Sequence, residues 1–324
     1  MITIHPIDPA DKRQARRFID LPFRLYRDCP QWVPPLLTDM VTAMNPAKHP
    51  FYEHSAAGFF LATRGERVVG RIAALENVNY NRHHDSRTGQ FYFFDCEDDD
   101  EAAAALFGAA CEWARARGLD TVIGPKGLSA FDGYGLLERG YEHRQMMNMM
   151  NYNYPYYTRL VEGQGFVKEV DFVSVFLPAS SFRLDERIHR IAERARQRQS
   201  LRVLDLRSKR DLRHWAPAIG RAYNQAFVNN WEYVPLTERE IQFVLDQLLL
   251  IANPRLLKFI AHDADVVGFA LSFPDISAAM QRARGHLLPF GLLDMLRELR
   301  VARGLAGNGA GILPQFHGLG GNAL

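Results

Sequence analysis

The feature that most constrains this chain is an order of elements that occurs twice. Each copy has a short apolar strand, a helix, a Val-Pro corner, a second helix and a hairpin that contains Val-Val-Gly. In the second copy, Thr237 and Glu240 predict a capping box at the start of the second helix. The corner and the hairpin are 35 residues apart in the first copy (Val33 to Val68) and 32 residues apart in the second (Val234 to Val266). Two landmarks at nearly equal separation indicate an internal duplication. The sequence therefore predicts two α/β units.

Composition excludes several classes of protein. At 324 residues, with 47% hydrophobic and 23% charged side chains, the chain is long enough for two globular domains. A formal net charge of +2 is too small to indicate a nucleic-acid partner. Cys29, Cys96 and Cys111 form no C-x-x-C pair, which argues against a disulfide framework or a metal site. With no apolar run near the roughly 20 residues that cross a bilayer and no signal peptide, we expect a cytoplasmic protein without a membrane partner.

A glycine-rich stretch near the carboxyl end is the strongest sign of a ligand. Gln315, Gly318 and Gly320 stand at the spacing Q-x-x-G-x-G, after an apolar run and before small residues that could begin a helix. Amides and the positive dipole end at such a point attract phosphate, and glycines let a polyanion approach closely. A Walker loop would need a Lys, which is absent after Gly320. The alternative is a simple glycine turn at the end of a strand.

This spacing resembles the acyl-CoA pyrophosphate loop of the GNAT (Gcn5-related N-acetyltransferase) superfamily, whose pattern is Q/R-x-x-G-x-G/A. The helix that ends in Gly165-Phe166 is similar to a late GNAT segment, and the duplicated order of elements is how a GNAT domain begins. The resemblance implies a tandem GNAT-like α/β (α+β) protein, with a mixed, mostly antiparallel sheet flanked by helices in each half. Residues 304–311 depart from it, since they are poor in the β-branched residues typical of a strand.

The domain boundaries follow from the two copies. We expect a degenerate GNAT-like domain at 1–178, closed by a strand over 167–177, then a helical linker at 179–200. A second domain at 201–324 carries the glycine loop. After Val234 only 90 residues remain, against 145 from Val33 to Pro178, so the second domain is expected to be C-terminally incomplete.

The first copy has carboxylates where the second has its glycine loop. The residues are Asp95, Glu97, Asp98, Asp99, Asp100 and Glu101. Carboxylates next to a pyrophosphate would repel it. They suit the start of a helix from about Glu101 instead, where they cap amides and face the positive end of the dipole. A metal site is the other interpretation, but no His lies at ligand spacing within the cluster. We therefore expect the first half to be structural or to bind the acceptor.

The resemblance also implies a set of site residues. The main chain of the glycine loop would hold the pyrophosphate, and the strand before it would lie along the pantetheine arm. These cofactor-binding positions are Ile312, Leu313, Gln315, Phe316, His317, Gly318, Leu319, Gly320, Gly321 and Asn322. The side chain of His317 is expected to be exposed and incidental.

Residues for the acceptor and the chemistry are less defined. Trp231 and Tyr233 lie at the corner between two helices, which often borders the acceptor site in GNAT proteins, and Glu232 is a candidate base there. A packing corner is the alternative, because Trp32 repeats the feature in the first copy. A helix over 290–300 falls between the second hairpin and the glycine loop, where it could cover an acceptor groove.

The sequence thus predicts an acyl-CoA-dependent N-acyltransferase. The transferred group is expected to be acetyl, with acetyl-CoA or another acyl-CoA as co-substrate. The acceptor would be a small amine that the residues do not identify, with no metal involved. The alternative is a non-catalytic sensor or scaffold that binds CoA or another nucleotide. A third possibility is that the duplicated fold serves only a protein interface.

Overall fold

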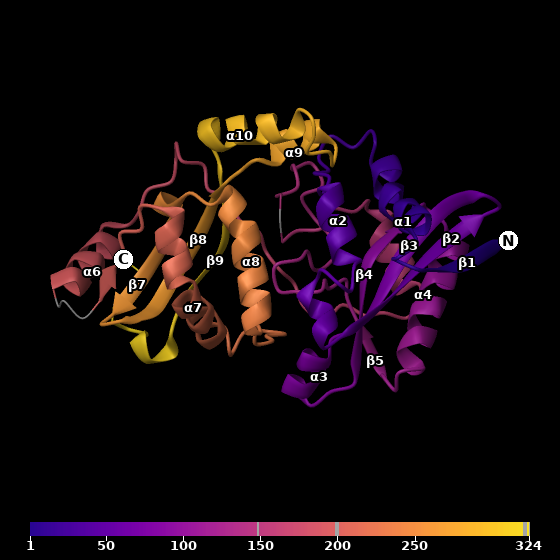
Figure 1. Cartoon of the computed structure of the whole chain (residues 1–324), viewed down its shortest axis with the longest axis horizontal. Helices are drawn as coiled ribbons and strands as arrows, with labels where there is room; N and C mark the ends of the chain where they lie inside the picture. Colours follow the sequence, from indigo (N-terminus) through magenta and orange to yellow (C-terminus); the bar gives the residue numbers. More distant parts are fainter. Residues whose placement is uncertain (148, 198–200, 320–322, 324) are drawn as a thin grey trace. The chain divides into compact units, whose positions relative to one another are not determined.

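The computed structural model describes residues 1–147, 149–197, 201–319 and 323. The chain forms two compact units (Figure 1). Unit 1 consists of residues 1–170 and 275–301, and unit 2 of residues 171–274 and 302–324. A segment from the second half of the sequence therefore packs within the first unit.

Unit 1 is built on a five-stranded sheet. Its strands, in spatial order, are β1 (Ile2–Ile7), β2 (Ala56–Arg64), β3 (Arg67–Glu76), β4 (Thr88–Cys96) and β5 (Thr121–Ile123). Neighbouring strands are antiparallel except β4 and β5, which are parallel. Its helices are α1 (Lys12–Leu25), α2 (Leu37–Ala43), α3 (Val78–His84), α4 (Asp100–Arg115), α5 (Tyr156–Glu162), α9 (Ser277–Ala283) and α10 (Gly291–Val301).

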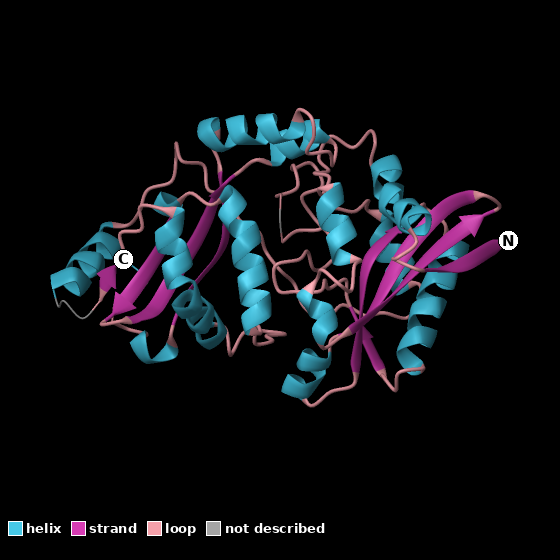
Figure 2. Cartoon of the chain, viewed as in Figure 1, coloured by secondary structure: helices cyan, strands magenta, loops and turns pink. Residues whose placement is uncertain are grey.

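The two faces of this sheet carry separate apolar cores. Successive side chains of a strand point to opposite faces. Phe59 and Leu61 of β2 accordingly pack with the α1 residue Phe18, whereas Phe60 and Ala62 pack with α4. Helices flank both faces of the sheet in Figure 2. The helix predicted from about Glu101 is confirmed as α4.

Unit 2 has a four-stranded, antiparallel sheet. Its strands, in spatial order, are β6 (Arg202–Val203), β7 (Leu257–His262), β8 (Asp265–Pro274) and β9 (Leu305–Ile312). Its helices are α6 (Glu186–Gln197), α7 (Lys209–Ala226) and α8 (Glu238–Ile251). The capping box that Thr237 and Glu240 predict is present at the start of α8, and Ser208 and Asp211 form another at the start of α7.

The duplication is visible in the pairing of each hairpin. In β2 and β3, Ala62 pairs with Gly70 and Thr63 with Val68, so that one residue of β3 is skipped. In β7 and β8, Ile260 pairs with Gly268 and Ala261 with Val266, which is the same irregularity. A bulge at the same place in both copies fixes the residue equivalence between them. The predicted fold class, two α/β units with mixed and mostly antiparallel sheets, is confirmed.

Two local expectations met different outcomes. The glycine-rich residues before the loop do form a strand, β9, despite their low β-propensity, because β8 offers them a full set of partners. The strand expected over 167–177 is wrong: these residues adopt no regular structure, and Val173 and Phe176 are exposed. An apolar pattern forms a strand only where a neighbouring strand pairs with it.

Candidate functional site

A pocket of about 430 Å³ lies beside β9 in unit 2. Its walls come from the three longer strands, from Val203 of β6 and from the end of α7. The lining residues are Val203, Ala226, Phe227, Asn230, Lys258, Ile260, Phe269, Ala270, Ala310, Gly311, Ile312 and His317. Its volume is within the range of small-molecule sites, and its lining combines apolar side chains with polar groups.

Small side chains on β9 make room for this pocket. Ala310 and Gly311 line it, facing Ala270 of β8 and Ala226 of α7. A Cβ atom added to Gly311 would lie 3.0 Å from the Cβ of Ala226, so this position has no space for a larger residue. The low content of β-branched residues in 304–311, which departs from a typical strand, therefore also shapes the pocket. The small side chain of Ala310 leaves space for the pocket, and glycine at 311 lets β9 approach α7 closely.

Three polar side chains face the pocket: Asn230, Lys258 and His317. The Nε2 atom of His317 is 3.1 Å from the carbonyl oxygen of Ile312. A carbonyl can only accept, so this contact assigns a proton to Nε2, and in the neutral ring Nδ1 is then the acceptor. Lys258 and Asn230 were not among the predicted site residues. The sequence distinguishes them only by comparison with the first copy, where less polar residues stand at the same positions. Lys258 corresponds to Phe60, and Asn230 corresponds to Cys29.

Of the predicted cofactor-binding residues, Ile312 and His317 line the pocket. Leu313 is buried, and its amide donates to the carbonyl of Val267 at 2.8 Å. Phe316 lies against the ring of His262, with a centroid separation of 5.2 Å. Gln315, Gly318 and Leu319 are exposed. Gly320, Gly321 and Asn322 lie outside the described residues.

The described part of the glycine loop is a tight turn. The amides of Phe316, His317 and Leu319 donate to the carbonyls of Leu313, Pro314 and Phe316, respectively. Gly318 has φ +78°, a left-handed conformation that favours glycine. The loop thus requires glycine for its backbone shape, while three of its amides are engaged within the turn itself.

The predicted acceptor corner lies next to the pocket in sequence. Asn230 lines the pocket, whereas Trp231, Glu232 and Tyr233 are not among its lining residues. Tyr233 is buried, and its hydroxyl donates to the carbonyl of Asn224 at 2.6 Å. The ring of Trp231 meets that of Phe172 edge-on. Glu232 has φ +56°, which is uncommon for a residue with a side chain.

The equivalent position in unit 1 is closed by tyrosines. The amide of Glu97 donates to Val69 at 2.9 Å, just as that of Leu313 donates to Val267, so Cys96 of β4 corresponds to Ile312 of β9. The Cys96 amide donates to the Tyr157 hydroxyl at 3.2 Å. The Tyr156 hydroxyl donates to the Cys96 carbonyl at 2.8 Å. Both main-chain groups at this edge of β4 are therefore already bonded within unit 1.

A buried ion pair lies beneath these tyrosines. Arg71 and Asp95 are cross-strand neighbours, with an Nη2–Oδ2 distance of 2.7 Å, and the exposed fraction of the Arg71 side chain is 4%. Arg71 also donates to the carbonyl of Phe18, and Tyr26 donates to Asp95 at 3.2 Å. Burial raises the pKa of Asp95, while the Arg71 guanidinium opposes this shift. In unit 2, Phe269 and Gly311 occupy the corresponding positions.

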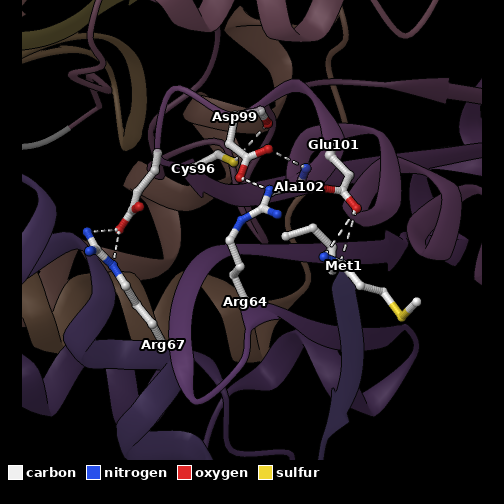
Figure 3. A network of polar contacts seen from close by, with 9 residues as sticks. Met1, Arg64, Arg67, Cys96, Asp99, Glu101 and Ala102 are labelled. Atoms are coloured by element: carbon white, nitrogen blue, oxygen red, sulfur yellow. Dashed lines mark hydrogen bonds and ion pairs between the residues drawn. The ribbon is translucent and has the colours of Figure 1, made fainter.

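The rest of the acidic cluster is paired with arginines. Asp99 caps α4 by accepting from the Ala102 amide, and Arg64 bonds both Asp99 and Glu101 (Figure 3). Glu97 binds Arg24 and Arg67, and Arg159 bridges Asp98 and Asp100. The capping role expected of these carboxylates is present at Asp99. The repulsion argument needs correction, since each carboxylate has a cationic partner. What closes this end of β4 is the hydroxyl groups of Tyr156 and Tyr157.

The described residues contain neither a cluster of metal ligands nor a membrane-spanning helix. No group of three or more His, Cys, Asp or Glu side chains in the described part of the chain is placed to hold a metal ion. Within the same residues, every helix is too short or too polar to cross a bilayer.

Comparison with known proteins decides the family. The chain is 33% identical over 296 residues to the bacterial ceramide synthase of Caulobacter vibrioides (strain NA1000 / CB15N), covering 89% of this chain and 74% of that protein. The chain belongs to the family of this ceramide synthase. It is also 27% identical over 292 residues to protein YghO of Escherichia coli (strain K12), covering 90% of this chain and 74% of YghO. No family model matches the sequence.

Solved structures also match the chain. A tandem GNAT protein from the clavulanic acid biosynthesis pathway, without AcCoA, is 12% identical with a TM-score of 0.49, covering 98% of this chain and 81% of that one. An aminoglycoside acetyltransferase from an uncultured soil metagenomic sample is 11% identical with a TM-score of 0.35, covering 55% and 95%. The GNAT-like architecture of this chain is defined by its own topology: antiparallel strands β1 to β4, then α4, then a parallel β5.

Proposed function

We propose that this protein is an acyl-CoA-dependent N-acyltransferase whose acceptor is the amine of a long-chain amino alcohol. The observation that carries the proposal is the 33% identity, over most of the chain, to a protein named a ceramide synthase. A ceramide is an amide of a fatty acid with such an amino alcohol. The relative's name therefore favours a long acyl group over the acetyl group expected from the sequence.

The acyl-CoA donor would bind in the pocket beside β9. The pantetheine arm would lie along the edge of β9, at Ile312 and Leu313, and the glycine loop at 315–322 would meet the pyrophosphate. Lys258 lines the pocket and carries the positive charge that phosphate needs. Because three loop amides donate within their own turn, binding the pyrophosphate through them requires the turn to rearrange.

The chemistry is attack of a neutral amine on a thioester. The amine nitrogen bonds to the carbonyl carbon, the carbon–sulfur bond breaks, and CoA leaves as a thiolate that takes up a proton. The amine's own proton passes to a base. Glu232 does not line the pocket but lies two residues after Asn230, which does, and it is kept as the candidate base. The side-chain amide of Asn230 is a candidate donor to the developing oxyanion. Positioning of the two substrates supplies most of the rate.

Unit 1 has a supporting role in this proposal. The hydroxyl groups of Tyr156 and Tyr157 already bond Cys96, at the point that corresponds to the donor edge of β9. A thioester arm could bind there only by displacing both tyrosines. We therefore place the donor in unit 2 alone.

The test is an acyl-transfer assay with two donors and two acceptors. Palmitoyl-CoA and acetyl-CoA are combined with sphinganine and ethanolamine, while thiol release and the amide product are measured. The proposal predicts fastest turnover with palmitoyl-CoA and sphinganine. Acyl-CoA binding without thiol release would favour the sensor instead, and turnover of acetyl-CoA with ethanolamine alone would refute the lipid acceptor.

A matched pair of variants ties the activity to the pocket. Ala310→Phe places a large ring in the pocket lining, whereas Gly307→Phe adds the same ring to the same strand, where a Cβ meets nothing within 4 Å. Thiol release should fall about 100-fold in the first variant and stay near the wild-type rate in the second. Equal rates in both would remove the pocket from the account.

A further inference from the structure

The helix α10 presents its leucines to the surface instead of burying them. Surface helices normally turn their apolar stripe toward the core. In α10, Leu292, Leu293 and Leu296 are exposed, while Asp294 and Glu298 lie on the inner, partly buried side. The inner side also carries the buried Met295, so the helix buries one apolar side chain fully and leaves three leucines exposed.

One arginine explains why the acids face inward. Arg282 of α9 bonds Asp294 through Nε at 2.6 Å and Glu298 through Nη2 at 2.7 Å. These contacts hold α10 against α9 and neutralise its carboxylates. The outer face of α10 is left with leucines and basic side chains.

The turn between the two helices extends this apolar surface. Leu288 and Phe290 have exposed fractions of 74% and 77%, the values of side chains that project into solvent. Apolar side chains that are exposed as a group, in contrast to single ones, mark interaction sites on proteins. We call Leu288, Phe290, Leu292, Leu293 and Leu296 the apolar face of the α9–α10 hairpin. Figure 1 labels the two helices of this hairpin.

The charge around the apolar face is positive. Residues 277–301 contain four arginines against two carboxylates, and Arg282 already pairs with both carboxylates. Arg284, Arg297 and Arg300 are exposed. An anionic partner would therefore complement this surface, whereas a second copy of the same face would meet like charges.

The hairpin is fixed to the rest of unit 1. The side-chain amide of Gln281 donates to the carbonyls of Pro30 and Trp32 at 2.7 and 2.9 Å. The Leu37 amide donates to Gly285 at 2.9 Å, and Arg144 pairs with Asp275 at 2.7 Å. These bonds fix the hairpin in unit 1, so less conformational entropy is lost when a partner binds the apolar face.

We propose that the apolar face of the α9–α10 hairpin docks on an anionic lipid surface. Leucine and phenylalanine side chains beside arginines are the composition of helices that lie in the membrane interface. At 11 residues, α10 is about 16 Å long, half of what a span needs. The inference goes beyond the proposed acyl transfer and stands without it, although docking would bring the enzyme to a lipid acceptor.

Vesicle flotation tests this directly with the full chain. Vesicles of phosphatidylcholine alone are compared with vesicles that also contain phosphatidylglycerol. The wild type should float with the anionic vesicles. Leu293→Glu/Leu296→Glu should weaken this binding by about tenfold or more, and Arg297→Gln/Arg300→Gln should weaken it only on the anionic vesicles.

The controls separate lipid docking from other occupants. Val228→Glu/Leu250→Glu removes two exposed apolar side chains elsewhere and should float like the wild type. Matching thermal unfolding curves show that each variant is folded. A wild type that stays with the unbound fraction, or equal flotation of both double glutamate variants, overturns the proposal. So does a wild-type dimer that Leu293→Glu/Leu296→Glu converts to a monomer, because the face would then join two copies.

Discussion

The edges of β4 and β9 are the same backbone position in two copies, and they differ in what covers them. At Cys96 of β4, the main-chain amide and carbonyl are bonded by Tyr157 and Tyr156. At Ile312 of β9, the carbonyl accepts from His317 and the side chain lines a pocket. Both copies of the fold therefore provide the same strand end. Side chains that are distant in the sequence, such as Tyr156 and Tyr157, determine whether a ligand can bind to it.

A second difference lies one residue earlier in each strand. Unit 1 has the ion pair of Asp95 with Arg71, and unit 2 has Gly311 beside Phe269. The first arrangement fills the space between strand and helix with hydrogen-bonded polar groups. The second leaves it to small and aromatic side chains. Substitutions in the two units measure how much each arrangement contributes to stability or to donor binding.

Removing Asp95 should have the largest effect. Asp95→Ala leaves the Arg71 charge buried without its partner, which costs about 3–5 kcal/mol of unfolding free energy. Urea denaturation measures this loss. The double variant Arg71→Met/Asp95→Leu should recover most of it, because neither charge is then buried. A single variant as stable as the wild type would mean that the ion pair does not hold unit 1 together.

Tyr157→Phe should have the next largest effect. It removes a hydroxyl that accepts from the Cys96 amide and from Tyr26. Leaving buried polar groups unsatisfied costs about 1–3 kcal/mol. Tyr141→Phe, which removes a hydroxyl from a partly buried tyrosine of the same unit, serves as the control and should lose less. If the order of the two losses were reversed, the closure of β4 would not depend on this hydroxyl.

Lys258→Gln should weaken the donor site without affecting the chemical step. Loss of one charge-assisted bond to phosphate corresponds to about a tenfold rise in KM for acyl-CoA. The rate at saturation should be unchanged. Steady-state kinetics separate the two, with Lys209→Gln, a lysine that bonds carbonyls at the end of α8, as the matched control. An unchanged KM would place the phosphates elsewhere.

The smallest effect concerns acid stability. The hydrogen bond from Arg64 lowers the pKa of Glu101 below its usual 4.5. A lowered pKa adds stability that is present above the unfolded value and is lost as the pH falls through the folded value. The melting temperature should therefore drop below about pH 4.5, and less steeply in Arg64→Gln than in the control Arg255→Gln. Parallel curves for both variants would contradict this.

The sequence predicted features formed by residues that are neighbours in the chain, and it did not predict contacts between residues far apart in the chain. The capping box of Thr237 and Glu240, the start of α4 and the two hairpins follow from neighbouring residues, and all are confirmed. The bonds of Tyr156 and Tyr157 to Cys96 span about 60 residues, so no local pattern indicates them. The same holds for the hairpin of α9 and α10, which packs within unit 1.

The predicted site residues overlap the pocket in part for the same reason. The Q-x-x-G-x-G spacing is a local pattern, and it lies at the end of β9 beside the pocket, where Ile312 and His317 are lining residues. Lys258 and Asn230 come from β7 and the residues after α7, and only the fold brings them to the pocket. The acidic residues 95–101 suggested repulsion, since their arginine partners on α1, β2, β3 and α5 are set by tertiary structure.

Calorimetric titration with palmitoyl-CoA tests the central claim, that unit 2 alone binds the donor. The wild type and Gly307→Phe should each bind one molecule per chain, and Ala310→Phe should bind none. Two molecules bound per chain, or one bound with unchanged affinity in Ala310→Phe, would contradict the account.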